Sequence, residues 1–333
     1  METTKYAALD GNAVRARLAE PAPTLILFHA HPDPDAVGSA FALSLWLSQM
    51  GSPAYCLCAD EIPERLRFLT DGLQESALLS SMPKEFENAR VIAVDTASPA
   101  QLGSLWEVFG DRISLMIDHH ERGTRYADGW VAPCAATGEM IYDLIADSGE
   151  DMTKRCSELI YAAISGDTGG FRYSNTTPGT HLRAAVLLES GIDAAHINHL
   201  LLEVRSPKLL MAEKLGFERL HLYDGGKIAI VTFPYALKAA HGLQDEHLET
   251  LVDVARRVFG VEIAAAIRQP GEGPVFRLST RAAVELDVSA VCATFGGGGH
   301  PRAAGATLTG FESIEQAEAA VLAAIRQAQE NTI

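Results

Sequence analysis

The feature that most restricts the fold is an alternation of short aliphatic runs with longer helical patterns between about Thr24 and Thr168. This alternation is typical of βαβ units and predicts an α/β domain built on a parallel sheet. The predicted strands are 24–28, 54–58, 91–94 and 113–117, and the predicted helices include 39–50, 137–148, 153–164 and 181–190.

A second, smaller α/β domain is predicted toward the C-terminus. The expected division is a first domain over 1–190, a helical connector over 191–222 and a second domain over 223–333. In the second domain we expect strands at 227–233, 261–268 and 275–280 and helices at 246–258, 288–295 and 313–329. A chain of 333 residues that is 47% hydrophobic can bury cores for both domains.

The N-terminus lacks a signal-peptide pattern, and no apolar run is long enough to span a bilayer, so we expect a cytoplasmic protein with no membrane partner. Five cysteines without a CxxC spacing predict reduced thiols. The net charge of −16 argues against binding long duplex nucleic acid, which depends on clustered Lys and Arg. Short anionic substrates remain compatible if cations and a few arginines neutralise their site.

Acidic and imidazole side chains follow four apolar runs. His29, Asp33 and Asp35 follow the first predicted strand, and Asp95 follows the run 91–94. The triplet Asp118-His119-His120 follows the run 113–117, and Asp167 closes the run 159–166. Because the carboxyl ends of parallel strands lie along one edge of a sheet, we expect these groups to converge there.

Carboxylates crowded in this way repel one another unless cations are present. The candidate ligands exceed the needs of one ion and suit two divalent ions about 3.5–4 Å apart, bridged by a shared carboxylate. Imidazoles mixed with carboxylates favour Mn²⁺, with Mg²⁺ or Co²⁺ as alternatives. The predicted metal ligands are His29, Asp33, Asp35, Asp95, His119 and Asp167.

Each cluster also has a purely structural interpretation. Asp33 and Asp35 are suited to a turn or a helix N-cap, Asp95 to the end of a strand, and Asp167 to a β-turn with the glycines that follow it. The occurrence of all four clusters at one predicted edge favours the metal site.

Four consecutive glycines, beside His300 and Arg302, form a second candidate site. Backbone amides in such a run can approach an anion closely, and Arg281 precedes it at the end of a predicted strand. We interpret the segment as a phosphate clamp, with a flexible connector as the alternative. The predicted substrate-binding residues are Arg281, Gly296, Gly297, Gly298, Gly299, His300 and Arg302.

Together the HxxxDxD pattern, Asp95, the DHH triplet, Asp167 and the late GGGGHPRAAG segment resemble the DHH phosphoesterase superfamily with its C-terminal DHHA1 domain. The pattern is most similar to the NrnA-type nanoRNases and 3′-phosphoadenosine 5′-phosphate (pAp) phosphatases. The resemblance implies an active site in the cleft between the two domains and Mn²⁺-dependent hydrolysis of short oligonucleotides, pAp, or both. His31 departs from the family, in which many members have Asn.

The resemblance also implies residue roles. His29, Asp33 and Asp95 would hold one ion, whereas Asp35, Asp95, His119 and Asp167 would hold the other. Asp118 would orient a ligand, His120 would face the phosphate, and the glycine-rich loop would bind the far end of the substrate.

The expected catalytic residues are therefore His120, Asp118 and Asp95, with a metal-bridging hydroxide that attacks phosphorus in line. A soluble cyclic or linear dinucleotide phosphodiesterase, a single-strand exonuclease and a non-catalytic nucleotide sensor are the alternatives. The polarity of degradation, homodimer formation and the role of Phe171, Arg172 and Tyr173 are left open.

Overall fold

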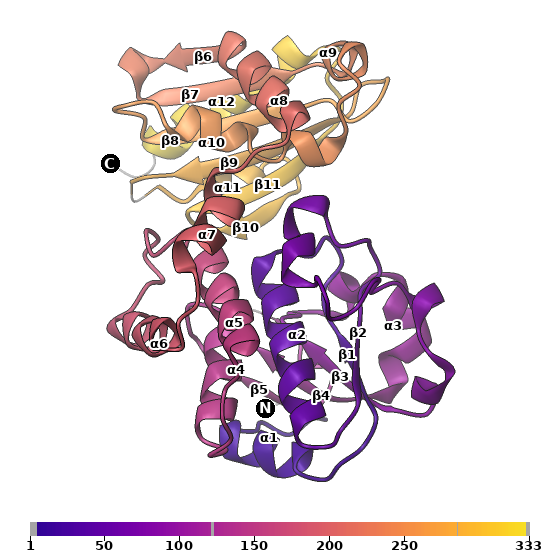
Figure 1. Ribbon diagram of the computed structural model, residues 1–333. Coiled ribbons are helices and arrows are strands. Elements are labelled where there is room, and N and C mark those ends of the chain that lie inside the picture. Colours follow the sequence, from indigo (N-terminus) through magenta and orange to yellow (C-terminus); the bar gives the residue numbers. More distant parts are fainter. Residues whose placement is uncertain (1–4, 121–122, 285, 331–333) are drawn as a thin grey trace. The chain divides into compact units, whose positions relative to one another are not determined.

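A computed structural model describes residues 5–120, 123–284 and 286–330 of the chain. The chain divides into two compact units, Met1–Val204 and Arg205–Ile333, each with its own hydrophobic core (Figure 1). The division falls inside the segment 191–222, so that residues 191–204 belong to the first unit and residues 205–222 to the second. Within the described ranges, no helix is both long and apolar enough to cross a bilayer.

The first unit contains a parallel sheet of five strands in the order β2-β1-β3-β4-β5. All four residues of β1 are buried, as expected when layers of helices cover both faces of a sheet. This confirms the predicted parallel sheet. The strands are β1 Thr24–Leu27, β2 Ala54–Leu57, β3 Arg90–Val94, β4 Ile113–Asp118 and β5 Gly129–Val131.

Three helices that contact one another cover one face of this sheet: α2 Pro34–Gln49, α4 Thr137–Ala146 and α5 Lys154–Asp167 (Figure 1). Gly38 in α2 permits a close crossing with α5, because a Cβ there would lie 2.5 Å from the Leu159 carbonyl oxygen. The other face packs against α3 Ser104–Phe109. The remaining helices are α1 Gly11–Leu18, α6 Pro178–Glu189, α7 Ala194–Asn198 and a π-helical turn at His199–Glu203, with 3₁₀ turns at Glu64–Leu69, Leu79–Ser81, Lys84–Phe86, Pro99–Leu102 and Gly110–Arg112.

The second unit contains a mixed sheet of six strands in the order β10-β11-β9-β8-β7-β6, in which β7 and β8 are parallel and the other pairs are antiparallel. Its strands are β6 Leu220–Tyr223, β7 Ile228–Phe233, β8 Ile263–Arg268, β9 Phe276–Ala282, β10 Gly298–His300 and β11 Ala303–Leu308. Its helices are α8 Pro207–Glu218, α9 Tyr235–Ala240, α10 Leu251–Arg256, α11 Val288–Ala293 and α12 Ile314–Glu330, with 3₁₀ turns at Asp224–Gly226 and Asp245–Leu248.

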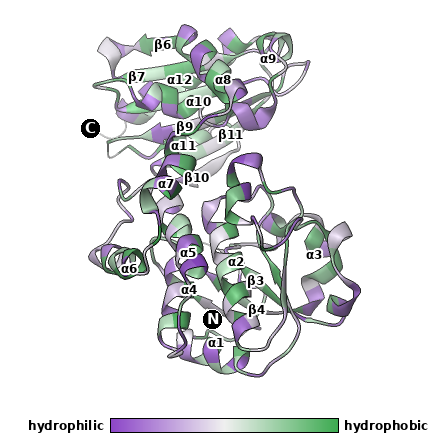
Figure 2. Ribbon diagram, in the orientation of Figure 1, coloured by the Kyte–Doolittle hydropathy of each residue, from purple (hydrophilic) through white to green (hydrophobic). Residues whose placement is uncertain are grey.

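The second unit has two hydrophobic cores, one on each face of its sheet, and successive side chains of β7 point alternately into one and the other. Ile228 and Ile230 pack with α11 and α12, whereas Ala229 and Val231 pack with α8 and α10. In the hydropathy colours of Figure 2, strands β3, β4 and β7 are largely green, whereas helices such as α8 alternate green with purple.

Several sequence expectations were wrong in detail. The predicted helix 153–164 forms as α5 but extends as far as Asp167. Helix α2 begins at Pro34 rather than at residue 39. The predicted helix 246–258 is a 3₁₀ turn followed by the short α10. Part of the glycine-rich segment is strand β10 and not a loop.

Candidate metal centre

The predicted ligands meet at the carboxyl edge of the first sheet. His29 follows β1, Asp95 follows β3 and His119 follows β4. Strands β1 and β3 are neighbours, and the chain runs from β1 to β2 on one side before returning to β3 on the other. Ligands bind at such reversals of strand order in open α/β sheets. The fold therefore places these side chains where a binding site is expected.

The start of α2 supplies two carboxylates. Asp33 caps the helix, because its Oδ1 accepts a hydrogen bond from the Ala36 amide at 2.9 Å. Asp35 lies in the first turn and is completely buried. Carboxylates are favoured at a helix N-terminus by the partial positive charge there. The capping role considered for Asp33 is thus real, and it leaves Asp33 close to the other candidate ligands.

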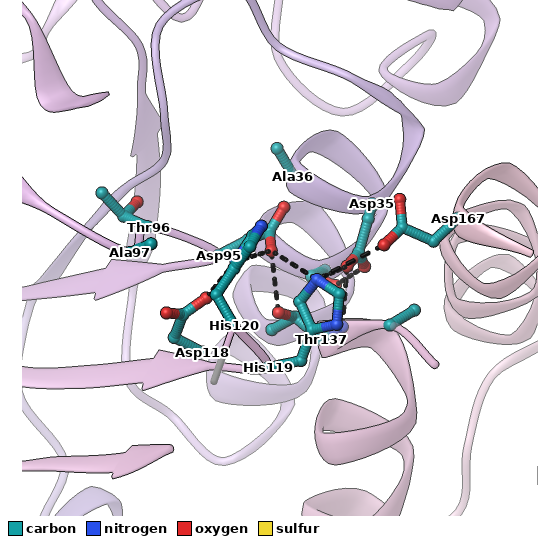
Figure 3. Close-up of polar contacts among 12 residues, drawn as sticks. Asp35, Ala36, Asp95, Thr96, Ala97, Asp118, His119, His120, Thr137 and Asp167 are labelled. Atoms are coloured by element: carbon teal, nitrogen blue, oxygen red, sulfur yellow. Dashed lines mark hydrogen bonds and ion pairs between the residues drawn. The ribbon is translucent and has the colours of Figure 1, made fainter. Parts of the chain in front are cut away.

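Asp95 lies between two groups of ligand atoms. His29 Nε2 is 3.6 Å from Asp33 Oδ1 and 3.5 Å from Asp95 Oδ2. His119 Nε2 is 3.7 Å from Asp95 Oδ1 and 3.3 Å from Asp167 Oδ2 (Figure 3). Each carboxylate oxygen of Asp95 therefore faces a different histidine.

The structure groups the six predicted ligands, together with His120, into sets whose atoms lie within 4.8 Å of one another. The sets are His29, Asp33 and Asp95; Asp35, His119 and Asp167; and Asp95, His119 and His120.

The backbone of Asp95 is unusual. Its φ of +54° is a left-handed conformation that is uncommon outside glycine and is concentrated at functional sites.

The N-terminus of α4 holds two of the carboxylates in place. The backbone amides of Thr137 and Gly138 donate to the two oxygens of Asp35, at 2.7 and 2.9 Å. The Thr137 hydroxyl donates to Asp95 Oδ1 at 2.9 Å (Figure 3). Sequence reasoning missed this contribution. It recognised Thr137 only as the start of a helix.

Close helix packing brings Asp35 and Asp167 to the same side of the centre. A Cβ at Gly166 would lie 2.6 Å from Pro34 Cβ, and one at Gly138 would lie 2.6 Å from Ala163 Cβ. Larger side chains at these positions would push α2, α4 and α5 apart. A glycine inside a helical pattern is the sequence signal that could have indicated these contacts.

The electrostatics of the centre fit divalent cations. Burial, reinforced by Asp95 and Asp167, raises the pKa of Asp35 well above its usual range. Burial, with Asp33 and Asp95, does the same to the pKa of Asp167. Burial alone would lower the pKa of His29, but its contacts with Asp33 and Asp95 outweigh burial and raise that pKa to about 11. Crowded carboxylates with imidazoles form a donor set suited to metal ions.

His120 depends on Asp118, the last residue of β4. Asp118 is 1% exposed, and its Oδ1 lies 2.8 Å from His120 Nδ1. This hydrogen bond raises the pKa of His120 to about 9. Asp118 belongs to none of the three ligand sets found among the described residues. Its side chain instead orients His120.

His31 and the segment after Asp167, which the sequence analysis also singled out, lie outside these three ligand sets. His31 is exposed, and its Nδ1 lies 3.0 Å from Asp60 Oδ2. The segment after Asp167 is a turn, in which the Phe171 ring stacks on His181 with 5.3 Å between ring centroids and the Arg172 Nε donates to the Gly169 carbonyl.

The second candidate site is an antiparallel hairpin of β10 and β11. Ala303 pairs with His300 on one side and with Arg281 on the other, so the three side chains leave the same face of the sheet. Arg302 is exposed at the turn. The flexible-connector alternative does not hold for the part that forms β10.

Two of the hairpin glycines are explained by close backbone contacts. A Cβ at Gly297 would lie 2.2 Å from the Gly305 carbonyl oxygen, and one at Gly299 would lie 2.6 Å from the Ala303 carbonyl oxygen. Gly296 has a positive φ of +73°, and Gly298 has open space around it. The glycine run therefore serves strand packing whether or not it also meets an anion.

Comparison with known proteins finds one family match within each of the two units. Residues 23–164 match the DHH family, N-terminal domain, and residues 226–331 match the DHHA1 domain. The chain is 31% identical to a bifunctional oligoribonuclease and PAP phosphatase NrnA from Thermus thermophilus, over 96% of this chain and 98% of the relative. It is 28% identical to the protein of the same name from Bacillus subtilis, over 88% of this chain and 92% of the relative.

A solved structure also shares the fold. The crystal structure of an exopolyphosphatase-related protein from Bacteroides fragilis superposes with a TM-score of 0.85 at 21% identity, covering 98% of this chain and 99% of the other. Both domain matches, in order, and the similarity to the Thermus relative over nearly the full length show that the chain belongs to the DHH family of phosphoesterases and carries the DHHA1 domain.

Proposed function

We propose that this phosphoesterase hydrolyses short oligoribonucleotides and 3′-phosphoadenosine 5′-phosphate with the help of two divalent metal ions. The observation that carries the proposal is the position of Asp95, whose two oxygens face His29 and His119. The names of the relatives from Thermus thermophilus and Bacillus subtilis support this substrate class. The net charge of −16 fits short substrates better than long ones.

The ligand sets suggest how the ions would be held. Mn²⁺ suits a site that combines imidazoles with carboxylates. When bound, the ions would supply positive charge near the phosphoryl oxygens and make a water molecule acidic enough to react at neutral pH. The residues that would hold one ion are His29, Asp33 and Asp95, and those that would hold the other are Asp35, Asp95, His119 and Asp167.

The protein side chains have separate tasks in this scheme. Asp118 accepts the hydrogen on His120 Nδ1, which fixes the ring and, by raising the pKa of His120, favours the imidazolium form, whose Nε2 also carries a hydrogen to donate to a phosphoryl oxygen. Such a donor stabilises the charge that develops on the phosphoryl group. The amides at the start of α4 keep Asp35 in place, so that it need not reorient during the reaction.

We also propose that Arg281 and His300 bind a phosphate group at the far end of the substrate. Both are donors, and the strand register places them on one face of the second sheet. Arg302 and the amide of Gly298, which has open space around it, are further candidates for this contact.

The test is a comparison of kcat/KM with Mn²⁺ for pAp, an RNA dinucleotide, a cyclic dinucleotide and a long single-stranded DNA, each repeated in EDTA. We expect turnover of the first two substrates, little turnover of the last two, and no turnover in EDTA. A clear preference for the cyclic dinucleotide or the long DNA would contradict the proposed substrate class. Equal activity in EDTA would contradict the role of the metal ions.

A further inference from the structure

Glu139 is a buried acid that the proposed chemistry does not use. It lies in the first turn of α4 and is 3% exposed. One carboxylate oxygen, Oε2, accepts a hydrogen bond from the Ala135 amide at 3.3 Å. The other oxygen, Oε1, is buried and has no hydrogen-bond partner among the described residues. Burying a carboxyl group with so little compensation is unfavourable, so its position needs a physical reason.

The peptide group that Glu139 contacts also contacts His119. The Ala135 N–H and the Cys134 C=O are the two ends of one peptide group. The Cys134 carbonyl oxygen lies 3.2 Å from His119 Nδ1. A carbonyl oxygen can only accept, so this contact requires a hydrogen on His119 Nδ1, and in the neutral ring Nε2 then keeps its lone pair. Nε2 is the atom that faces Asp95 and Asp167.

We propose that Glu139 is a positioning residue for the metal centre, acting on His119 through the 134–135 peptide group. A carboxylate that accepts from the amide end of a peptide polarises the group and strengthens its carbonyl as an acceptor. The stronger carbonyl holds His119 in the Nδ1–H form and makes Nε2 a better ligand. This inference rests on the proposed role of His119 as a metal ligand.

The other two histidines of the centre provide an internal comparison. His120 Nδ1 binds a carboxylate directly, through Asp118, at 2.8 Å. His29 Nδ1 contacts a backbone carbonyl, that of Ala30, also at 2.8 Å. His119 lies between these two cases, with a carboxylate one peptide group away.

The segment that carries this contact is fixed to the metal centre from a second direction. The Asn175 side-chain amide donates to the Ala135 carbonyl at 3.0 Å and to the Asp167 carbonyl at 3.1 Å. The same segment is therefore joined both to the backbone of one candidate ligand, Asp167, and to the ring of another, His119. A shift in the 134–136 backbone would alter both.

The test compares the wild type with Glu139→Gln, which keeps the shape but not the charge, and Glu139→Leu, which removes the acceptor. Mn²⁺ affinity is measured from the electron paramagnetic resonance signal of free Mn²⁺. We expect affinity to fall in the order wild type, Glu139→Gln, Glu139→Leu, with a loss of about 10–100-fold for the last. Affinities within twofold of the wild type for both variants would overturn the proposal. Should Glu139→Leu fail to fold, Glu139→Gln decides alone.

A second measurement needs no metal. In protein with ¹⁵N-labelled histidines, with the His119 signals assigned by their loss in His119→Gln, we expect the wild type to show hydrogen on Nδ1. We expect Glu139→Leu to show a mixture of Nδ1–H and Nε2–H forms. An unchanged Nδ1–H form in Glu139→Leu would overturn the proposal. A wild type that bound no Mn²⁺ would contradict the proposed function. The ¹⁵N measurement on His119 would still show, without metal, whether Glu139 controls the form of that ring.

Glu318 supplies a matched control. It is another buried acid, 6% exposed, on α12 of the second unit, and it accepts a hydrogen bond from the Tyr223 hydroxyl at 2.9 Å. Glu318→Leu should lower the Tm measured in EDTA but leave Mn²⁺ affinity within twofold of the wild type. An equal loss of Mn²⁺ affinity in Glu318→Leu and Glu139→Leu would show general destabilisation and overturn the proposal.

Discussion

Asp35 and Asp95 of the metal centre lie buried near further carboxylates, whereas most glycines of the β10–β11 hairpin lie exposed at the edge of the second sheet. Buried like charges remain unfavourable until something outside the protein neutralises them. Close backbone packing is enough to explain why glycine occurs at positions 297 and 299 of the hairpin. The side chains of the first region therefore favour a bound cation, whereas the glycines of the second need no ligand to explain them. In the second region, the argument for a ligand depends on Arg281 and His300.

The largest expected effect is the loss of the shared carboxylate. Asp95→Ala should lower kcat/KM for pAp by at least about 10³-fold, because Asp95 faces both histidine groups. Asp60→Ala is the matched control, since Asp60 pairs with His31 outside the three ligand sets, and its kcat/KM should stay near that of the wild type. Substantial activity in Asp95→Ala would refute the shared-ligand arrangement.

A smaller loss of activity is expected for a substitution of Asp118, which contacts His120. Asp118→Asn replaces the charged acceptor of His120 Nδ1 with an amide, so kcat should fall about 10–100-fold. KM and Mn²⁺ affinity should change little, because Asp118 is not in a ligand set. Steady-state kinetics and a Mn²⁺ titration measure the two quantities separately. If the Mn²⁺ affinity of Asp118→Asn fell as far as that of Asp95→Ala, Asp118 would be a ligand itself.

The proposed phosphate contact in the second unit predicts a different kinetic pattern. Arg281→Ala should raise KM for pAp about tenfold, the cost of one charged hydrogen bond, and leave kcat for a small artificial phosphodiester unchanged. Arg277, four residues earlier on β9, donates to Thr307 instead and provides the control Arg277→Ala. Equal losses on both substrates in Arg281→Ala would count against the contact.

The smallest expected effect distinguishes two possible roles of the glycine run, which are strand packing and contact with substrate. Gly297→Ala should reduce the free energy of unfolding by about 1–3 kcal/mol, because its Cβ would collide with the Gly305 carbonyl. Gly298→Ala should not, because nothing lies within 4 Å of the added Cβ. Thermal unfolding measures both. If Gly298→Ala raised KM for pAp at an unchanged Tm, the glycine run would also contact substrate.

Much of the first unit could be predicted because its signals are local. Aliphatic runs separated by helical patterns predict a parallel sheet, and a parallel sheet places His29, Asp95 and His119 at one edge. Asp167 reaches the same place for a different reason: it ends α5, and Gly166 lets that helix lie close to Pro34. The expectation of convergence was right for Asp167, although Asp167 follows the predicted helix 153–164 and not a strand of the sheet.

The residues that sequence reasoning missed depend on tertiary packing. Thr137 and Glu139 look like ordinary residues of a helix start, and only the folded structure places them against Asp35, Asp95 and the 134–135 peptide group. Strand β10 was missed because glycine has a low propensity for strands. Pairing with β11 overrides that propensity.

The central claim is that two divalent ions share Asp95, and counting bound ions tests it most directly. A Mn²⁺ titration of the metal-free protein, followed by the signal of free Mn²⁺, gives the number of ions bound per chain. The account predicts two ions for the wild type and the loss of tight binding of both in Asp95→Ala. A wild type that binds one ion or none, or an Asp95→Ala protein that still binds two tightly, would contradict it.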